Sequence, residues 1–373
     1  MTRPLRRRRR GSGFTLVELM ISLLVSTLLV ILMLSVFARL SFAFREQQTA
    51  VGLQQTLSAA RTAIEYDARH AGLLVSQGFT ISADLGAERH SPVRVINRTF
   101  GPDELGFYYA DPSVQALVLG TPAPSPVSLT VDDIGAFAAG DLVVLSTPDT
   151  ISMANPISAM EAKIALFTAC VLRIEAVAGN EVTFETSGDW GNSLNEHCAA
   201  PVGATTMMYR FVAHTWRVDT TRPDLAPLQL DTTGGLATPA FTDQAYGIVD
   251  LQAATYFYDG DGVDSDDPDA DGDRDWSSSD AQEARTDPIP LVESFVAPLM
   301  MSISIVSRTS SNVEGVFTAS SPQLADPDNP TANTIGDRLS FPLPSATDPM
   351  FSGNRLYRFV TFQTDLRNLG VGR

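Results

Sequence analysis

Carboxylates outnumber the basic side chains Lys and Arg in this sequence by 43 to 26, and one of them stands in an unusual place. Residues 13–38 read GFTLVELMISLLVSTLLVILMLSVFA, and Glu18 is the single charged residue in this apolar run. An ionised side chain in the membrane half of a helix costs free energy, so it usually has a partner or a function. Glu18 is therefore a candidate for charge pairing between packed helices.

A second group of carboxylates lies in residues 259–275, DGDGVDSDDPDADGDRD, which hold nine aspartates in 17 residues. Part of the run matches the opening of a D-x-D-x-D-G calcium loop. The matching residues are Asp267, Asp269, Asp271, Gly272 and Asp273. The acid that such a loop needs eleven residues after Asp267 is missing, because Ser278 stands there. Two interpretations stay open: a Ca²⁺ site as the single candidate cofactor, or a solvated acidic loop.

The two cysteines, Cys170 and Cys198, are candidates for a disulfide, because both follow the apolar run and would lie in an oxidising compartment. A metal site built from these cysteines and His197 lacks a fourth ligand. We expect His70 on a helix surface, and His90 and His214 have no evident partners in the sequence. None of the common hydrolase, metalloprotease, phosphate-loop or dinucleotide motifs occurs, so we predict a protein that is not an enzyme.

The charge distribution separates the amino terminus from the rest of the chain. The 373 residues carry a net charge of −17, yet residues 1–13 hold six arginines and no acid. The remainder has 20 basic against 43 acidic residues, so its surface repels nucleic acid. An arginine run directly before an apolar segment predicts a membrane topology signal, with the arginines in the cytoplasm.

The apolar segment 14–38 is long enough to cross a bilayer. A helix of that length measures about 37 Å, against a hydrocarbon core of roughly 30 Å. An ordinary secretory signal has a shorter apolar region and a small-residue cleavage site, which this sequence lacks. The sequence thus predicts a single-pass membrane protein with its amino terminus in the cytoplasm and its body on the other side of the membrane.

The stretch GFTLVEL at 13–19 resembles the type III signal of type IV pilins and type II secretion pseudopilins. The resemblance implies that a prepilin peptidase of the inner membrane cuts after Gly13 and methylates the new amino terminus at Phe14. It also implies that the chain is an inner-membrane protein with its body in the periplasm. Glu18 would then be the fifth residue of the mature chain. Its carboxylate could neutralise the terminal ammonium of a neighbouring subunit, which replaces two isolated charges in an apolar bundle by one compensated pair.

A long helix follows from the absence of proline between Pro4 and Pro92. Residues 39–75 are amphipathic and continue the membrane helix to about residue 71, with Gly72 as a plausible end. One face collects apolar side chains at 4-3-4 spacing, namely Leu53, Leu57, Ala60 and Ile64. Two helices broken near Gly52 are the alternative.

The rest of the chain, residues 76–373, predicts a β-rich body that contains the acidic loop 259–287. Short β-type runs alternate with Pro, Gly, Asp and Ser, and Gly179-Asn180 is a hairpin signal. The predicted strands lie at 93–97, 105–110, 114–119, 127–131, 141–146, 170–177, 181–186, 206–219, 247–259, 299–308 and within 354–369. The fold class is therefore α+β, with a long amino-terminal helix packed on a mainly antiparallel sheet, as in pilins.

Two further stretches are similar to PilW-type minor pilins. IEYDARHAGL (64–73) resembles their D-x-R-x-A-G stretch, and residues 245–370 resemble their C-terminal half. The positions that match are Asp67, Arg69, Ala71, Gly72, Arg358, Leu366, Arg367 and Asn368.

The resemblance implies a minor pilin that joins other minor pilins and the major pilin through its amino-terminal helix. Such a protein helps to initiate assembly of a type IV pilus, supports twitching motility or adhesion, and ends at the cell surface. Two alternatives stay open: a J-like minor pseudopilin of a type II secretion system, and a membrane-anchored calcium-binding adhesin.

Overall fold

The structure is a computed structural model. The chain divides into two compact units, residues 1–52 and residues 53–373. The structure describes residues 15–75, 79–81, 88–96, 98, 101–120, 127–146, 169–185, 206–234, 239–257, 276–277, 289–290, 298–309, 350, 355 and 357–366.

The amino-terminal helix α1 runs without a break from Leu16 to His70, over 55 residues. This confirms the single long helix, and the alternative of two helices broken near Gly52 is wrong. A glycine inside a helix costs only about 1 kcal/mol relative to alanine. That cost is too small to interrupt a helix that continues for many residues on both sides.

Helix α1 ends where the sequence predicted. Gly72 has a φ of 80°, a left-handed conformation that glycine adopts without strain. Its N–H leaves the helix and donates to the carbonyl of Tyr108 at 2.9 Å, while the N–H of Leu73 donates to the carbonyl of His70 at 2.9 Å. The helix end is therefore held by a backbone hydrogen bond to a strand.

The predicted apolar face of α1 is buried in the main core of the second unit. Leu53, Leu57, Ala60 and Ile64 are all buried, and Ala68 and Ala71 continue the same face. From Leu57 onward these side chains belong to one cluster with residues from two β-sheets, among them Leu105, Trp216 and Ile303. The second half of the helix thus packs against both sheets, whereas the side chains before it do not join this cluster.

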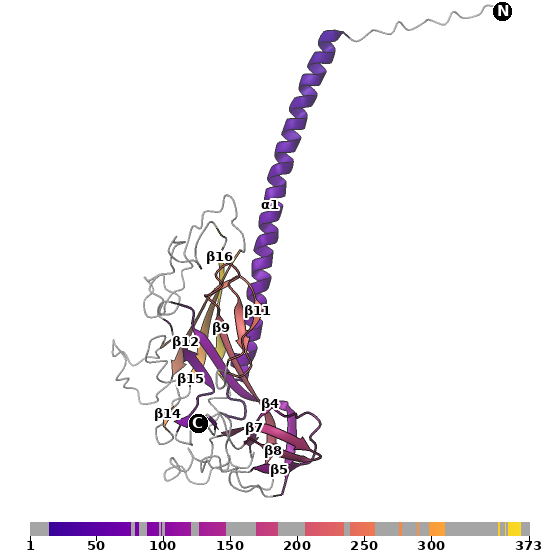
Figure 1. Ribbon diagram of the computed structural model, residues 1–373. Coiled ribbons are helices and arrows are strands. Elements are labelled where there is room, and N and C mark those ends of the chain that lie inside the picture. Colours follow the sequence, from indigo (N-terminus) through magenta and orange to yellow (C-terminus); the bar gives the residue numbers. More distant parts are fainter. Residues whose placement is uncertain are drawn as a thin grey trace, which may run out of the picture. The chain divides into compact units, whose positions relative to one another are not determined.

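The larger sheet holds ten strands in the order β11-β10-β9-β6-β7-β8-β5-β4-β3, with β1 added beside β7 (Figure 1). All of its strand pairs are antiparallel except β1–β7. The strands are β1 Phe79–Ile81, β3 Val93–Ile96, β4 Glu104–Leu119, β5 Ser128–Val131, β6 Leu142–Ser146, β7 Ala169–Ala178, β8 Glu181–Phe184, β9 Met207–Val218, β10 Leu228–Asp231 and β11 Thr242–Ala245.

A smaller antiparallel sheet has the order β13-β12-β15-β16, and β2 pairs with β14 as a separate short ribbon (Figure 1). These strands are β2 Glu88–Arg89, β12 Ile248–Phe257, β13 Trp276–Ser277, β14 Ile289–Pro290, β15 Pro298–Arg308 and β16 Tyr357–Asp365. The long helix packed on mainly antiparallel sheets confirms the predicted α+β, pilin-like fold.

Six strands of the larger sheet close on themselves, a feature that the sequence did not predict. The hydrogen-bonded pairs run β4–β9–β6–β7–β8–β5 and return to β4. A second apolar cluster fills this small barrel, with Leu172, Phe184 and Met208 among its members. Closure removes exposed sheet edges, which otherwise invite association with other chains.

Strand β4 takes part in both the open sheet and the barrel. The sequence predicted two strands at 105–110 and 114–119, but the structure has one strand of 16 residues. Its register against β9 shifts between Asp111 and Gln115, which is the signature of a bulge. The bulge bends this single strand from the open sheet into the barrel. The prediction of two separate strands is therefore wrong, because the chain changes direction there without ending the strand.

A buried carboxylate links the two sheets. Asp103 accepts backbone hydrogen bonds from Arg98 at 3.0 Å and from Ala253 on β12 at 2.9 Å. Its own N–H donates to the carbonyl of Leu251 at 2.8 Å. Because buried polar groups must be hydrogen-bonded, these contacts fix the loop before β4 against the second sheet.

Candidate functional sites: the helix start and the helix anchor

Thr15 directly precedes α1 and is the first described residue, so Gly13 and Phe14 lie outside the described residues. Thr15 and Glu18 form a reciprocal pair at the helix start. The N–H and hydroxyl of Thr15 donate to Glu18 Oε2 at 3.2 and 3.1 Å, and the N–H of Glu18 donates to Thr15 Oγ1 at 3.3 Å. This T-x-x-E arrangement is a capping box, which satisfies two helix N–H groups that have no partner within the helix.

The cap occupies only one oxygen of Glu18. Among the described residues, no hydrogen-bond donor contacts Glu18 Oε1. The carboxylate can therefore cap its own helix and still accept a charge-assisted hydrogen bond from a second chain. The structure adds a local role for Glu18 to the intermolecular role that the sequence suggested.

The first half of α1 exposes a long series of apolar side chains. Leu16 through Phe44 include 20 exposed large hydrophobic residues. Within the described part of the chain, α1 alone is long and apolar enough to cross a membrane, by length and composition. Surface of this kind is stable in lipid or against other helices rather than in water.

The other functional end of α1 is a buried carboxylate in its last turns. Asp67 is 3% exposed and accepts hydrogen bonds from Tyr109 Oη at 2.9 Å and from Trp216 Nε1 at 2.7 Å. His214 Nδ1 lies 3.0 Å from both carboxylate oxygens, and it must carry a hydrogen to donate to them. Strands β4 and β9 thus supply three side chains to one helix residue.

We call Asp67, Tyr109, His214 and Trp216 the helix anchor. Burial, and next the negative charge of Asp67, raise the pKa of Tyr109 well above its usual value of 10. Tyr109 therefore keeps its proton and remains a donor at every physiological pH. Its ring also lies edge-on to the imidazole of His214, with ring centres 6.2 Å apart.

The anchor gives physical meaning to the D-x-R-x-A-G stretch. Asp67 binds the sheet, Ala71 is fully buried where the helix meets it, and Gly72 ends the helix in a left-handed conformation. Arg69 instead forms an ion pair with Glu65. Three of the four positions therefore serve helix docking, and the fourth stabilises the helix.

Comparison with known proteins identifies the amino-terminal segment. Residues 8–34 match the prokaryotic N-terminal methylation motif. The chain carries a prepilin-type signal. The matched segment contains Gly13, Phe14 and Glu18 and ends within the apolar half of α1. The chain is therefore pilin-like at its amino terminus, and the motif implies processing by a prepilin peptidase and indicates anchoring in the inner membrane.

The remaining comparisons add no assignment for the pilin-like body. No curated protein matches the chain. One solved structure that matches is the Gp54 tailspike of Acinetobacter baumannii bacteriophage AP22, in complex with a capsular saccharide of A. baumannii. It is 14% identical over 28% of this chain and 15% of the tailspike, with a TM-score of 0.18. A similarity of this size supports no argument about fold or function.

The two cysteines lie only partly within the described structure. Cys170 is in strand β7, paired with Leu145 of β6 and Thr80 of β1, and Cys198 lies outside the described residues. The Cys170–Cys198 disulfide stays a prediction.

The acidic run also lies outside the described residues, including Asp267, Asp269, Asp271 and Asp273. The structure does describe the two strands that the acidic run connects, β12 and β13. Strand β12 pairs with β13 through Thr255–Ser277 and Tyr256–Trp276, so the run joins two antiparallel strands. The calcium site stays a prediction, and the part of the chain that the structure describes holds no cluster of metal-binding side chains.

Three of the four histidines lie in the described part of the chain, and two of them have contacts that the sequence did not reveal. His214 has a partner, Asp67, which is 147 residues away along the chain. His90 stacks on Phe79 at 5.3 Å between ring centres. His70 lies on the helix surface as predicted, and its Nδ1 is 2.7 Å from the carbonyl oxygen of Tyr66. His197 lies outside the described residues.

Proposed function

We propose that this chain is a minor pilin of a type IV pilus, of the PilW type. It is cleaved after Gly13, methylated at Phe14, and incorporated with other minor pilins into the complex that starts pilus assembly. The observation that carries the proposal is a prepilin methylation motif at the start of a helix with two distinct halves. The first half exposes apolar side chains, and the second is anchored in a large β-rich body.

The separation of roles along α1 supports assembly rather than simple membrane attachment. A plain membrane anchor needs only an apolar span, and the helix cap by itself uses only one oxygen of the Glu18 carboxylate. Here the Glu18 carboxylate keeps one oxygen without a described donor, which suits it to accept the amino terminus of a neighbouring subunit. A charge pair between helices compensates two groups that are each costly in an apolar environment.

A J-like minor pseudopilin of a type II secretion system is the second candidate, since it uses the same signal and helix. The resemblance of residues 245–370 to PilW-type proteins and the large body favour the pilus. Deletion of the gene in its native host separates the candidates. Loss of surface pili and of twitching, with normal exoprotein secretion, is the expected result.

Loss of secretion with intact pili would instead assign the chain to a type II secretion system. Loss of surface attachment alone, with pili and secretion intact, would support the membrane-anchored calcium-binding adhesin. Complementation with the wild-type gene restores the phenotype and controls for polar effects on neighbouring genes.

Substitution of Glu18 tests its role between subunits. We expect Glu18→Ala to be cleaved normally but recovered at a much lower level in sheared pili, because the neighbouring ammonium loses its counter-charge. The measurement is an immunoblot of the sheared fraction against the membrane fraction.

Glu18→Gln separates the charge from the helix cap, since glutamine completes a capping box without a charge. The proposal predicts that Glu18→Gln is as poorly incorporated as Glu18→Ala. If Glu18→Gln is recovered at the wild-type level and Glu18→Ala is not, the residue acts only as a cap.

A further inference from the structure

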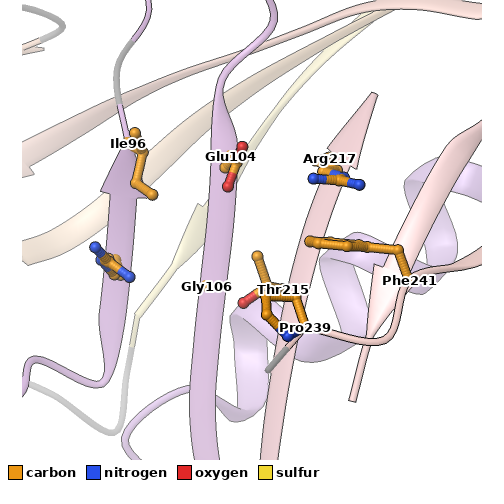
Figure 2. Close-up of a pocket in the computed structure, with 8 residues that line it drawn as sticks. Ile96, Glu104, Gly106, Thr215, Arg217, Pro239 and Phe241 are labelled. Carbon is orange, nitrogen blue, oxygen red and sulfur yellow. The ribbon is translucent and has the colours of Figure 1, made fainter. Parts of the chain in front are cut away.

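A small pocket lies on the face of the larger sheet that points away from α1 (Figure 2). Side chains alternate along β4, so Phe107 and Tyr109 face the helix while Glu104 and Gly106 face the pocket. The cavity measures about 170 Å³. Its main polar and aromatic lining comes from Arg94, Glu104, Thr215, Arg217 and Phe241, above Gly106.

Arg217 is held in a fixed orientation at this pocket. Its guanidinium carbon lies 3.4 Å from the centre of the Phe241 ring, and Figure 2 shows the two planes stacked. Its Nε donates to Gln229 Oε1 at 3.1 Å. Among the described residues no acceptor contacts its two terminal nitrogens, so the outer edge of a rigid guanidinium is left for a ligand.

The single carboxylate at the rim does not neutralise Arg217. Glu104 is ion-paired with Arg98, which is outside the pocket lining. The pocket lining itself holds two arginines, Arg94 and Arg217, against one glutamate, in a chain whose net charge is −17. A local excess of guanidinium groups in an acidic protein indicates recognition of an anion.

The floor of the pocket is kept open by a glycine. A Cβ at Gly106 would lie 2.9 Å from Tyr108 Oη and 3.2 Å from Arg94 Cβ, so a side chain there would collide with the floor. Tyr108 is buried, which raises its pKa to about 12, and its hydroxyl donates to the carbonyl of Gly234 at 2.7 Å. Below the cavity the Tyr108 side chain is therefore buried, uncharged and held by a hydrogen bond.

We propose that this pocket binds a small carboxylate-bearing ligand of about the size of one acidic sugar. A guanidinium fork and a carboxylate form two parallel hydrogen bonds, and a fork fixed on an aromatic ring loses little entropy on binding. The cavity volume is smaller than the roughly 300–1,000 Å³ of sites for drug-sized ligands. It therefore suits a ligand with one ring that carries one carboxylate group. The site is separate from the helix anchor and from the methylation motif.

The test is saturation-transfer NMR on the full chain in detergent micelles, with sodium glucuronate and glucose at equal ionic strength. Glucose is the neutral counterpart of glucuronate. We expect glucuronate to bind and glucose to give no signal at the same concentration. Equal signals for the two sugars would overturn the assignment, as would complete displacement of glucuronate by an equal concentration of inorganic phosphate.

The matched variants are Arg217→Lys and Arg173→Lys. Arg217→Lys keeps the positive charge and the aliphatic stem but loses the planar fork, so we expect affinity for glucuronate to fall about tenfold or more. Arg173 pairs with Glu185 outside the pocket, and its substitution is expected to leave binding unchanged. Unchanged binding by Arg217→Lys, or equal losses in both variants, would refute the site. Wild-type circular dichroism of Arg217→Lys establishes that a loss is not due to unfolding.

Discussion

Replacing Asp67 by alanine is expected to lower the free energy of unfolding of the β-rich body by about 3–5 kcal/mol. The substitution leaves the buried Tyr109 hydroxyl and Trp216 indole N–H without an acceptor. Each unsatisfied buried donor costs about 1–3 kcal/mol. The change also removes the partner of His214, so helix and sheet lose their main polar connection. The total is a large share of the 5–15 kcal/mol that typically stabilises a folded protein.

The measurement is urea unfolding of the full chain in detergent micelles, followed by tryptophan fluorescence. Asp67→Asn keeps the size and one acceptor oxygen, so it should cost less, about 1–2 kcal/mol. Glu65→Ala is the matched control on the same helix. Its carboxylate forms surface ion pairs with Arg61 and Arg69, which are worth at most about 1 kcal/mol. A loss for Asp67→Ala no larger than that for Glu65→Ala would contradict the anchor.

The second large effect is expected at the processing site. Gly13→Ala should leave most of the protein as uncleaved precursor, because the peptidase requires a small, flexible residue directly before the bond that it cuts. The precursor retains six arginines directly before α1, so its helix start cannot enter an apolar bundle of neighbouring helices. We therefore expect almost no variant protein in sheared pili, as measured by immunoblot.

Gly11→Ala is the control for this experiment, since it makes the same chemical change two residues away within the leader. It should be cleaved and assembled as the wild type is. Normal amounts of mature protein from Gly13→Ala, or equal defects in both variants, would show that Gly13 is not the recognition residue.

The sequence predicted those parts of the fold that depend on local periodicity. Ile64 and its neighbours at 4-3-4 spacing are on the buried face of α1, and Gly72 ends the helix, because helix periodicity and glycine conformation are short-range properties. The hairpin at Gly179-Asn180 was also predicted, and β7 and β8 are its strands. The T-x-x-E pattern of Thr15 and Glu18 is also a short-range signature of a capping box, but the sequence interpretation assigned Glu18 only an intermolecular role.

Long-range features could not be predicted from the same patterns. The partners of Asp67 lie 42, 147 and 149 residues away, so its place in D-x-R-x-A-G marked a position without showing what it contacts. Barrel closure depends on β4 pairing with both β5 and β9, which no single strand pattern encodes. Arg217 and Phe241 meet at the pocket because β9 and the residues before β11 are brought together by the sheet order.

We propose that the mature subunit starts at a methylated Phe14 and that Glu18 accepts the amino terminus of a neighbouring subunit. Mass spectrometry of the amino-terminal peptide from purified membranes and sheared filaments measures that start directly. We expect a chain that begins with N-methylated Phe14 in both fractions. A chain that begins with Met1, or at any residue other than Phe14, would contradict it.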